Sequence, residues 1–146
     1  MKHFTKEWYR QLKTANKDAA LQEALERPPQ EYATYLKEKN LTAIDRKLHY
    51  HQWQVSVAYR RGNDFFIHLQ HPNEAEPTVT LRLIDTRMIG QELGEELGNA
   101  YVWLHHEVDL TSFGYELRLL LAEKGSAALM EWTVDCARME LAEFDL

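Results

Sequence analysis

Charged residues that alternate along the second half of the chain are the first candidates for chemistry. Glu107, Glu116 and Arg118 lie in strand-like segments that would place them on one face of a sheet, and Glu131 follows nearby. Paired carboxylates can act as general acid and general base when their surroundings push their pKa values apart. Alternating charges are equally typical of the solvent-facing side of an antiparallel sheet. We therefore treat these four residues as candidates for ligand or partner binding and assign no catalytic residue.

Two groups of histidines invite a test for a metal site. His49 and His51 are two residues apart, and His105 is followed directly by His106. Zinc needs three or four ligands that converge at about 2.0–2.3 Å. Neighbouring residues on a strand point to opposite faces, so His105 and His106 cannot bind one ion without a bulge. We expect no metal and no cofactor, and we interpret these histidines as solvated or capping residues.

The single cysteine, Cys136, does not suggest a nucleophile. It falls beside Trp132 and Val134 on the expected core side of a strand, where a thiol usually serves as an inert packing group. The sequence also has no Gly-Xaa-Ser-Xaa-Gly elbow, no phosphate-binding glycine loop and no HExxH helix. Because no motif identifies a reaction, the sequence argues against an enzyme more than for one.

The spacing of apolar residues changes near residue 48 and divides the chain into two segments. Apolar positions first recur at helical spacing, and from Trp53 onward they alternate two by two. We expect Thr5 to cap the first helix, with Trp8 on its buried side, and Pro28-Pro29 to end it. Asn40 fits the position just past the end of the next helix.

The second segment contains several runs with strand character that are joined by short connections. Short connections are typical of hairpins, so neighbouring strands should be antiparallel. We expect an α+β fold in which N-terminal helices pack on one face of a mostly antiparallel sheet of about six strands. One domain should cover residues 1–146, with a helical segment over 1–41 and a sheet segment over 48–146. The expected strands are 53–59, 65–69, 78–84, 101–108, 115–121 and 130–136, with an irregular connection or short helix at 91–99 and a short terminal element at Leu141 and Phe144.

Two strand registers follow from matching apolar residues on facing strands. Around the turn at Gly62-Asn63, a loop of odd length would place Val57 opposite Leu69 on one apolar face. We expect Gly62 or Asn63 to have a positive φ in such a loop. In the last hairpin, the same matching sets Arg118 opposite Glu131 as an ion pair on the outer face.

Several short strings of the chain are typical of one protein family. The strings are His3-Phe4-Thr5-Lys6-Glu7-Trp8-Tyr9, Leu48-His49-Tyr50-His51, Gly62-Asn63-Asp64-Phe65, His106-Glu107-Val108 and Tyr115-Glu116-Leu117-Arg118-Leu119-Leu120. Together they resemble an uncharacterised bacterial family of unknown function whose members open with a FTKEWY-like string. Tyr50 stands where that family tends to have Asp, and Arg118 stands where it tends to have His. The family has no established activity, so the resemblance supports the fold and leaves the function open.

The net charge of −6 is unevenly distributed along the chain. Residues 1–49 hold 10 Lys or Arg and 7 Asp or Glu, whereas residues 50–146 hold 7 and 16. The acidic sheet segment would repel a phosphate backbone, so we expect no nucleic-acid partner. It suits a basic protein partner, although an acidic surface can also serve solubility alone.

Two functions stay open at this point. The chain has no apolar run of the roughly 18 residues that a membrane helix needs, and its first residues lack the pattern of a signal peptide. We therefore expect a cytoplasmic protein without membrane contact. The first function is a small acidic protein-binding module of the partner or immunity type. The alternative is a small-molecule binder or enzyme that uses a pocket between the helices and the sheet, and a cavity lined by polar residues would favour it.

Overall fold

The computed structural model describes residues 4–14, 30–73, 78–89, 101–125 and 128–144. The expectations for the end of the first helix at Pro28-Pro29 and for residues 91–99 lie outside the described residues. The described helices and strands are α1 (Lys6–Thr14), α3 (Gln30–Glu38), α4 (Thr42–Lys47), β1 (Gln54–Arg61), β2 (Asp64–Gln70), β3 (Thr78–Ile89), β4 (Tyr101–Leu110), β5 (Tyr115–Glu123) and β6 (Leu129–Phe144).

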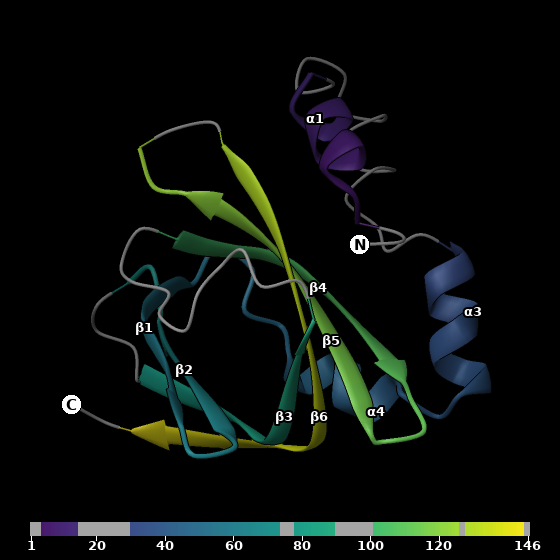
Figure 1. Ribbon diagram of the computed structural model, residues 1–146. Coiled ribbons are helices and arrows are strands. Elements are labelled where there is room, and N and C mark those ends of the chain that lie inside the picture. The colour runs from purple at the N-terminus through teal and green to yellow at the C-terminus, as the bar shows by residue number, and fades with distance from the viewer. Residues whose placement is uncertain (1–3, 15–29, 74–77, 90–100, 126–127, 145–146) are drawn as a thin grey trace.

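The six strands form a closed antiparallel barrel in the order β1-β2-β3-β6-β5-β4 (Figure 1). This arrangement confirms the mostly antiparallel sheet of six strands, and it adds the closure, which the sequence did not indicate. Closure depends on a short contact, because the described residues of β1 and β4 form two pairs, Gln54↔Val102 and Val55↔Tyr101. The barrel is therefore weakly closed at the junction between β1 and β4.

Two helix boundaries follow the local chemistry that the sequence predicts. The Trp8 amide donates a hydrogen bond to the Thr5 hydroxyl at 3.0 Å, so Thr5 caps α1. Asn40 follows α3 with a φ of 58°, the left-handed conformation expected just past a helix end. Both sequence-based expectations are confirmed.

The helices are distributed around the barrel. In Figure 1, α3 lies beside β4, α1 lies above α3 and contacts β6, and α4 lies near the lower end of the barrel. The expectation that the helices pack together on one face is therefore met only in part. Within the described part of the chain, the helices are too short and too polar to cross a membrane.

The observed register of β1 and β2 shows that the sequence-based expectation was wrong. A two-residue loop, Gly62-Asn63, joins the strands, and Val57 lies opposite His68. The mismatch of apolar sides is resolved by a β-bulge just before Val57, which shifts the register by one residue. Val55 consequently lies opposite Leu69 in the core, whereas Val57 is 43% exposed. The glycine of the loop has the expected positive φ, 64°.

The register of β5 and β6 differs from the expected one by two residues. Arg118 lies opposite Thr133, and Glu131 lies opposite Leu120, so the expected cross-strand pair of Arg118 and Glu131 is wrong. A shift of two residues keeps every side chain on its predicted face, because side chains alternate with a period of two. Matching apolar residues therefore identifies the face but does not distinguish registers that differ by two.

The last strand is longer than the sequence indicates. β6 runs without a break from Leu129 to Phe144, and its second half pairs with β3. Leu141 lies opposite Leu81, so the expected separate terminal element is the end of this strand. The long pairing of β3 with β6 joins the β1–β2 hairpin to the β4–β5 hairpin in one barrel.

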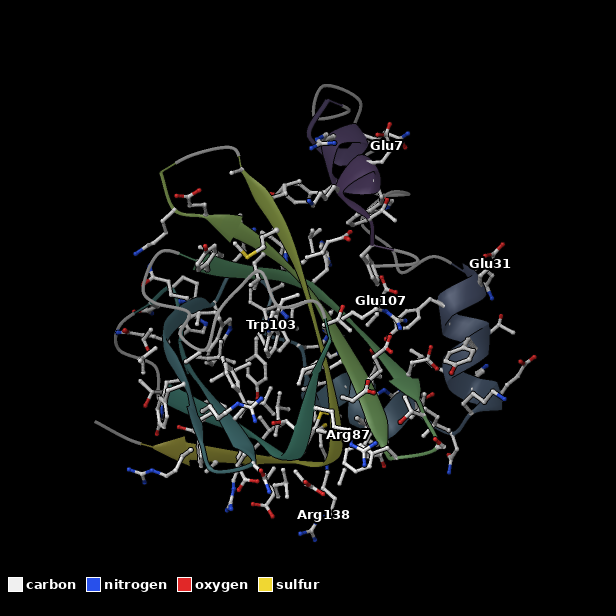
Figure 2. The ribbon with its side chains drawn as sticks, viewed as in Figure 1. Glu7, Glu31, Arg87, Trp103, Glu107 and Arg138 are labelled. Carbon is white, nitrogen blue, oxygen red and sulfur yellow. The ribbon has the colours of Figure 1, made fainter. Side chains whose placement is uncertain are left out.

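The barrel interior is filled by large apolar side chains. Figure 2 shows Trp103 inside the barrel, and its side chain is fully buried. Cys136 is also fully buried in this core, as expected from the sequence. Burial, together with the charge of Asp135, raises the pKa of the Cys136 thiol to about 12, so this thiol is not a nucleophile near neutral pH.

Candidate functional site

β4 has an edge that no strand covers within the described part of the chain. The first two residues of β4 pair with β1. The next residue, Trp103, forms backbone hydrogen bonds with the irregular residues that precede β1. Its N–H donates to the Trp53 carbonyl at 2.9 Å, and its carbonyl accepts from the Gln52 N–H at 2.8 Å. His51 Nδ1 then donates to the Leu104 carbonyl at 2.6 Å. Irregular chain and side chains cover this edge, and they leave space beside it.

A cavity of about 460 Å³ lies along the free edge of β4. This volume falls in the range of about 300–1,000 Å³ that is typical of small-molecule sites. We call the cavity the histidine pocket, because four histidines contribute to its wall. It is lined by Phe4, Tyr32, Asp45, His49, Tyr50, His51, Trp103, Leu104, His105 and His106. The wall therefore combines aromatic rings with polar groups from α3, from α4, from the chain between α4 and β1, and from β4.

Three side chains of the pocket form a connected hydrogen-bonded group. His106 Nε2 lies 2.8 Å from Asp45 Oδ1, and the Tyr32 hydroxyl donates to the same oxygen at 2.8 Å. The Tyr32 oxygen in turn accepts from the Val108 amide at 2.9 Å, on the free edge of β4. Burial alone would raise the pKa of Asp45, but the hydrogen bonds from His106 and Tyr32, together with the nearby imidazoles of His106 and His49, outweigh it and lower that pKa. Asp45 is thus an ionised carboxylate held between two donors.

His105 occupies the other side of β4 and is covered by the start of the chain. Its ring stacks on the Phe4 ring with centroids 4.8 Å apart, and Trp8 meets it edge-on at 4.8 Å. Burial, with the neighbouring His51 and His106, lowers the pKa of His105 to about 3. His105 is therefore neutral at physiological pH. Trp8 packs against the core in a partly buried position, as its expected place on α1 requires.

Two residues that line the pocket each have a buried side-chain nitrogen without a hydrogen-bond partner among the described residues. These nitrogens are Nε1 of the fully buried Trp103 and Nε2 of His105. Most buried polar atoms in folded proteins are hydrogen-bonded, so each exception calls for an explanation. An indole nitrogen can only donate.

The histidines of the pocket form two close pairs. The ring centroids are 5.7 Å apart for His49 and His106 and 4.9 Å apart for His51 and His105. No group of three or more His, Cys, Asp or Glu side chains in the described part of the chain could hold a metal ion. The sequence-based expectation of no metal and no cofactor stays a prediction.

The four candidate residues from the sequence lie on the outer face of the barrel. The register places Glu107 of β4 directly opposite Arg118 of β5, and Glu131 lies two pairs further along on β6. Arg118 contacts Glu107 at 3.3 Å and also forms an ion pair with Glu116. Asp109 completes the group at 3.5 Å from Arg118. The structure thus brings Glu107, Glu116 and Arg118 together, and it leaves Glu131 exposed beside them.

This cluster is not the wet sheet face that the alternating charges suggested. Glu107 is fully buried and Arg118 is 5% exposed. Figure 2 shows Glu107 on the side of the barrel that faces α1 and α3. The Phe4 amide donates to Glu107 Oε2 at 3.0 Å, and the Tyr35 hydroxyl donates to Asp109. The N-terminal segment and α3 therefore cover the part of the sheet that was expected to face solvent.

Three carboxylates form a row across the outer face next to Arg118. Asp109 of β4 lies opposite Glu116 of β5, and Glu116 lies opposite Asp135 of β6. Burial and the charge of Glu116 raise the pKa of Asp135, against the opposing effect of Arg87. Like charges directly opposite each other destabilise a sheet. We call Asp109, Glu116 and Asp135 the carboxylate row.

Sequence reasoning missed the group formed by Tyr32, Asp45 and His106. One signal was present, because His106 alternates with the buried Val108 and so occupies a core position of its strand. A polar residue at a core position needs a partner. The identity of that partner was not readable, since Asp45 is 61 residues away and reaches His106 through the gap beside β4.

Comparisons of the chain with protein-family models, with curated proteins and with solved structures each return no match. The resemblance to the family with a FTKEWY-like opening therefore stays an expectation from the sequence.

Proposed function

We propose that this protein binds a small planar molecule that carries hydrogen-bond acceptors, and that the histidine pocket is its binding site. The cavity volume, about 460 Å³, accommodates a molecule of one or two rings. Aromatic side chains of the wall, including Phe4, Tyr50 and Trp103, offer flat apolar surface to such rings. This proposal develops the alternative function that the sequence left open. A cytoplasmic location stays a prediction.

The observation that carries the proposal is the composition of the pocket wall. It combines aromatic rings with the imidazole rings of four histidines. An imidazole can donate a hydrogen bond through one ring nitrogen and accept through the other. A concave site with aromatic surface and a few polar groups is typical of small-molecule binding.

A fragment screen with two matched histidine variants tests this proposal. Planar carbonyl compounds and nitrogen heteroaromatics are screened against the full chain by ligand-observed NMR, and each hit is titrated against His49→Ala and His71→Ala. Of these two histidines, only His49 lines the pocket. Loss of one neutral hydrogen bond should raise the Kd by about fivefold to tenfold in His49→Ala and leave it unchanged in His71→Ala. A screen without hits, or equal Kd values for the wild type and both variants, would reject the proposal.

A second proposal retains the protein-binding module of the partner or immunity type. The carboxylate row supports it, because three acids lie side by side and Arg118 reaches only Asp109 and Glu116 among them. A lysine or arginine of a basic protein partner would relieve the repulsion within the row.

The test of the second proposal is the salt dependence of association. A partner recovered by affinity pull-down should associate faster at low salt, and Glu116→Gln and Glu131→Gln should slow its association without unfolding the protein. Glu7→Gln on α1 is a matched control, since Figure 2 shows this residue away from the barrel. An association rate that responds to neither salt nor these changes would contradict the electrostatic account.

A further inference from the structure

His106 lines the histidine pocket and uses only one of its two ring nitrogens in a hydrogen bond with the described residues. His106 is 8% exposed, and its Nε2 is occupied by Asp45 at 2.8 Å. None of the described residues forms a hydrogen bond with its other nitrogen, Nδ1. His106 therefore has one anchored nitrogen and one available nitrogen at the wall of a cavity.

The hydrogen bonds of Asp45 determine which nitrogen of a neutral His106 carries the proton. An ionised carboxylate only accepts hydrogen bonds, so Nε2 must donate to Asp45. The lone pair of the neutral ring is then on Nδ1. Tyr32 donates to the same carboxylate and fixes its position, while Val108 fixes the Tyr32 hydroxyl. This is the arrangement of an oriented general base.

The groups that face His106 come from four parts of the chain. Tyr32 belongs to α3 and Asp45 to α4, and His49 follows α4 with its ring 5.7 Å from that of His106. On β4 itself, the Trp103 ring lies 6.1 Å away and His105 is the adjacent residue. Asp45 is the only one of these groups with a full negative charge. It therefore stabilises a positive charge that forms on His106.

We propose that His106 is a general acid–base residue that transfers a proton at an acidic C–H bond of the molecule bound in the histidine pocket. This inference rests on the proposed function of that pocket. In the step, His106 Nδ1 takes the proton, and the electron pair of the broken C–H bond moves into the ligand toward its acceptor atom. Asp45 stabilises the imidazolium that forms on His106. Return of the proton to another atom of the ligand completes an isomerisation and regenerates the base. Asp45 and Tyr32 are positioning residues.

5-Nitrobenzisoxazole is a suitable probe, because it is planar, carries acceptors and has one acidic C–H bond. A base removes the proton from its ring carbon, the C–H electrons form a nitrile, and the N–O bond breaks to release a coloured phenolate. Turnover is measured by absorbance, and binding is measured separately by ligand-observed NMR. The variants are His106→Gln, His106→Ala, Asp45→Asn and, as a matched control, His71→Gln, which removes a histidine outside the pocket wall.

His106→Gln should lower kcat by about 100-fold, near the lower end of what one positioned acid–base group contributes. Asp45→Asn should lower kcat by about tenfold and leave KM within about twofold, because its carboxylate acts on the base and not on the probe. Imidazole added to His106→Ala should restore part of the turnover, which a purely structural role of His106 would not allow. His71→Gln should turn over like the wild type, and circular dichroism checks that each variant is folded.

Two results would overturn the inference, and they differ in what else they reject. If the probe binds but the wild type and His106→Gln turn it over equally, the acid–base role is wrong and the binding pocket stands. If the probe does not bind the wild type, the proposed function fails for this ligand class and the acid–base role fails with it.

Discussion

The inner and outer sides of β4 contain two polar groups with different surroundings. On the outer side, Glu107 is fully buried and is matched by Arg118 from the neighbouring strand. On the inner side, His106 is matched by Asp45, which comes from a helix across the gap beside β4. Arg118 contacts Glu107 and Asp109 of the paired strand and Glu116 of its own strand, so carboxylates surround its guanidinium group. Asp45 comes from a helix and not from a neighbouring strand, so a cavity remains beside Asp45 and His106. This cavity can hold a ligand.

The largest effect should come from breaking the outer group. Arg118→Met leaves the carboxylate of Glu107 buried without its cation, and removing one member of a buried ion pair costs about 3–5 kcal/mol. The free energy of unfolding from urea denaturation measures this loss. A loss below about 1 kcal/mol would show that the hydrogen bond from the Phe4 amide suffices to hold Glu107.

Removing the cover of His105 should have a smaller effect. Trp8 is partly buried against Phe4 and His105, so Trp8→Ala should cost about 2 kcal/mol, less than the roughly 3–5 kcal/mol of a fully buried tryptophan. Urea denaturation gives the value. A variant as stable as the wild type would mean that α1 does not hold its place on β4 through Trp8.

His105 should make the protein sensitive to acid. Its pKa is about 3 in the folded state against an ordinary value of 6.5, so the unfolded chain binds the proton more readily. The free energy of unfolding should therefore fall as the pH drops below about 6.5, by at least about 1 kcal/mol before pH 4. His105→Gln should lose this part of the pH dependence, as measured by urea denaturation at several pH values. An unchanged pH dependence in the variant would contradict the buried, neutral state of His105.

The smallest effect concerns the carboxylate row. The pKa of Asp135 is raised, so its ionised form is disfavoured in the folded protein. Asp135→Asn should stabilise the protein at pH 7 by less than about 1 kcal/mol, and the gain should vanish as the pH falls through the pKa of Asp135. Thermal denaturation at two pH values tests this. Destabilisation by Asp135→Asn at pH 7 would show that the ionised carboxylate has a favourable partner.

The sequence predicts the strands and their faces because side-chain alternation is a local property. The period-two pattern places Leu119 and Trp132 in the core correctly. It does not predict the bulge near Val57. A bulge adds one residue to a strand and so changes which side chains face the core, whereas strict alternation assumes that no residue is added. Nor does it distinguish the two registers of β5 and β6, which bury the same side chains.

The sequence predicts the outer candidates and misses the inner ones for a related reason. Glu107 and Arg118 lie on adjacent strands, so alternation alone puts them on one face. The burial of both was not readable, because it depends on where the N-terminal segment lies over the sheet. Asp45 and His106 meet only because β4 has a free edge, and edge coverage depends on the whole topology.

The tautomer of His106 tests the central claim most directly, namely that the inner side of β4 presents an available base to the histidine pocket. In ¹⁵N-labelled protein at a pH where the ring is neutral, histidine-selective NMR distinguishes a protonated ring nitrogen from an unprotonated one. We expect a protonated Nε2 held by Asp45 and an unprotonated Nδ1. A proton on Nδ1, or a ring that exchanges freely between both tautomers, would contradict the account.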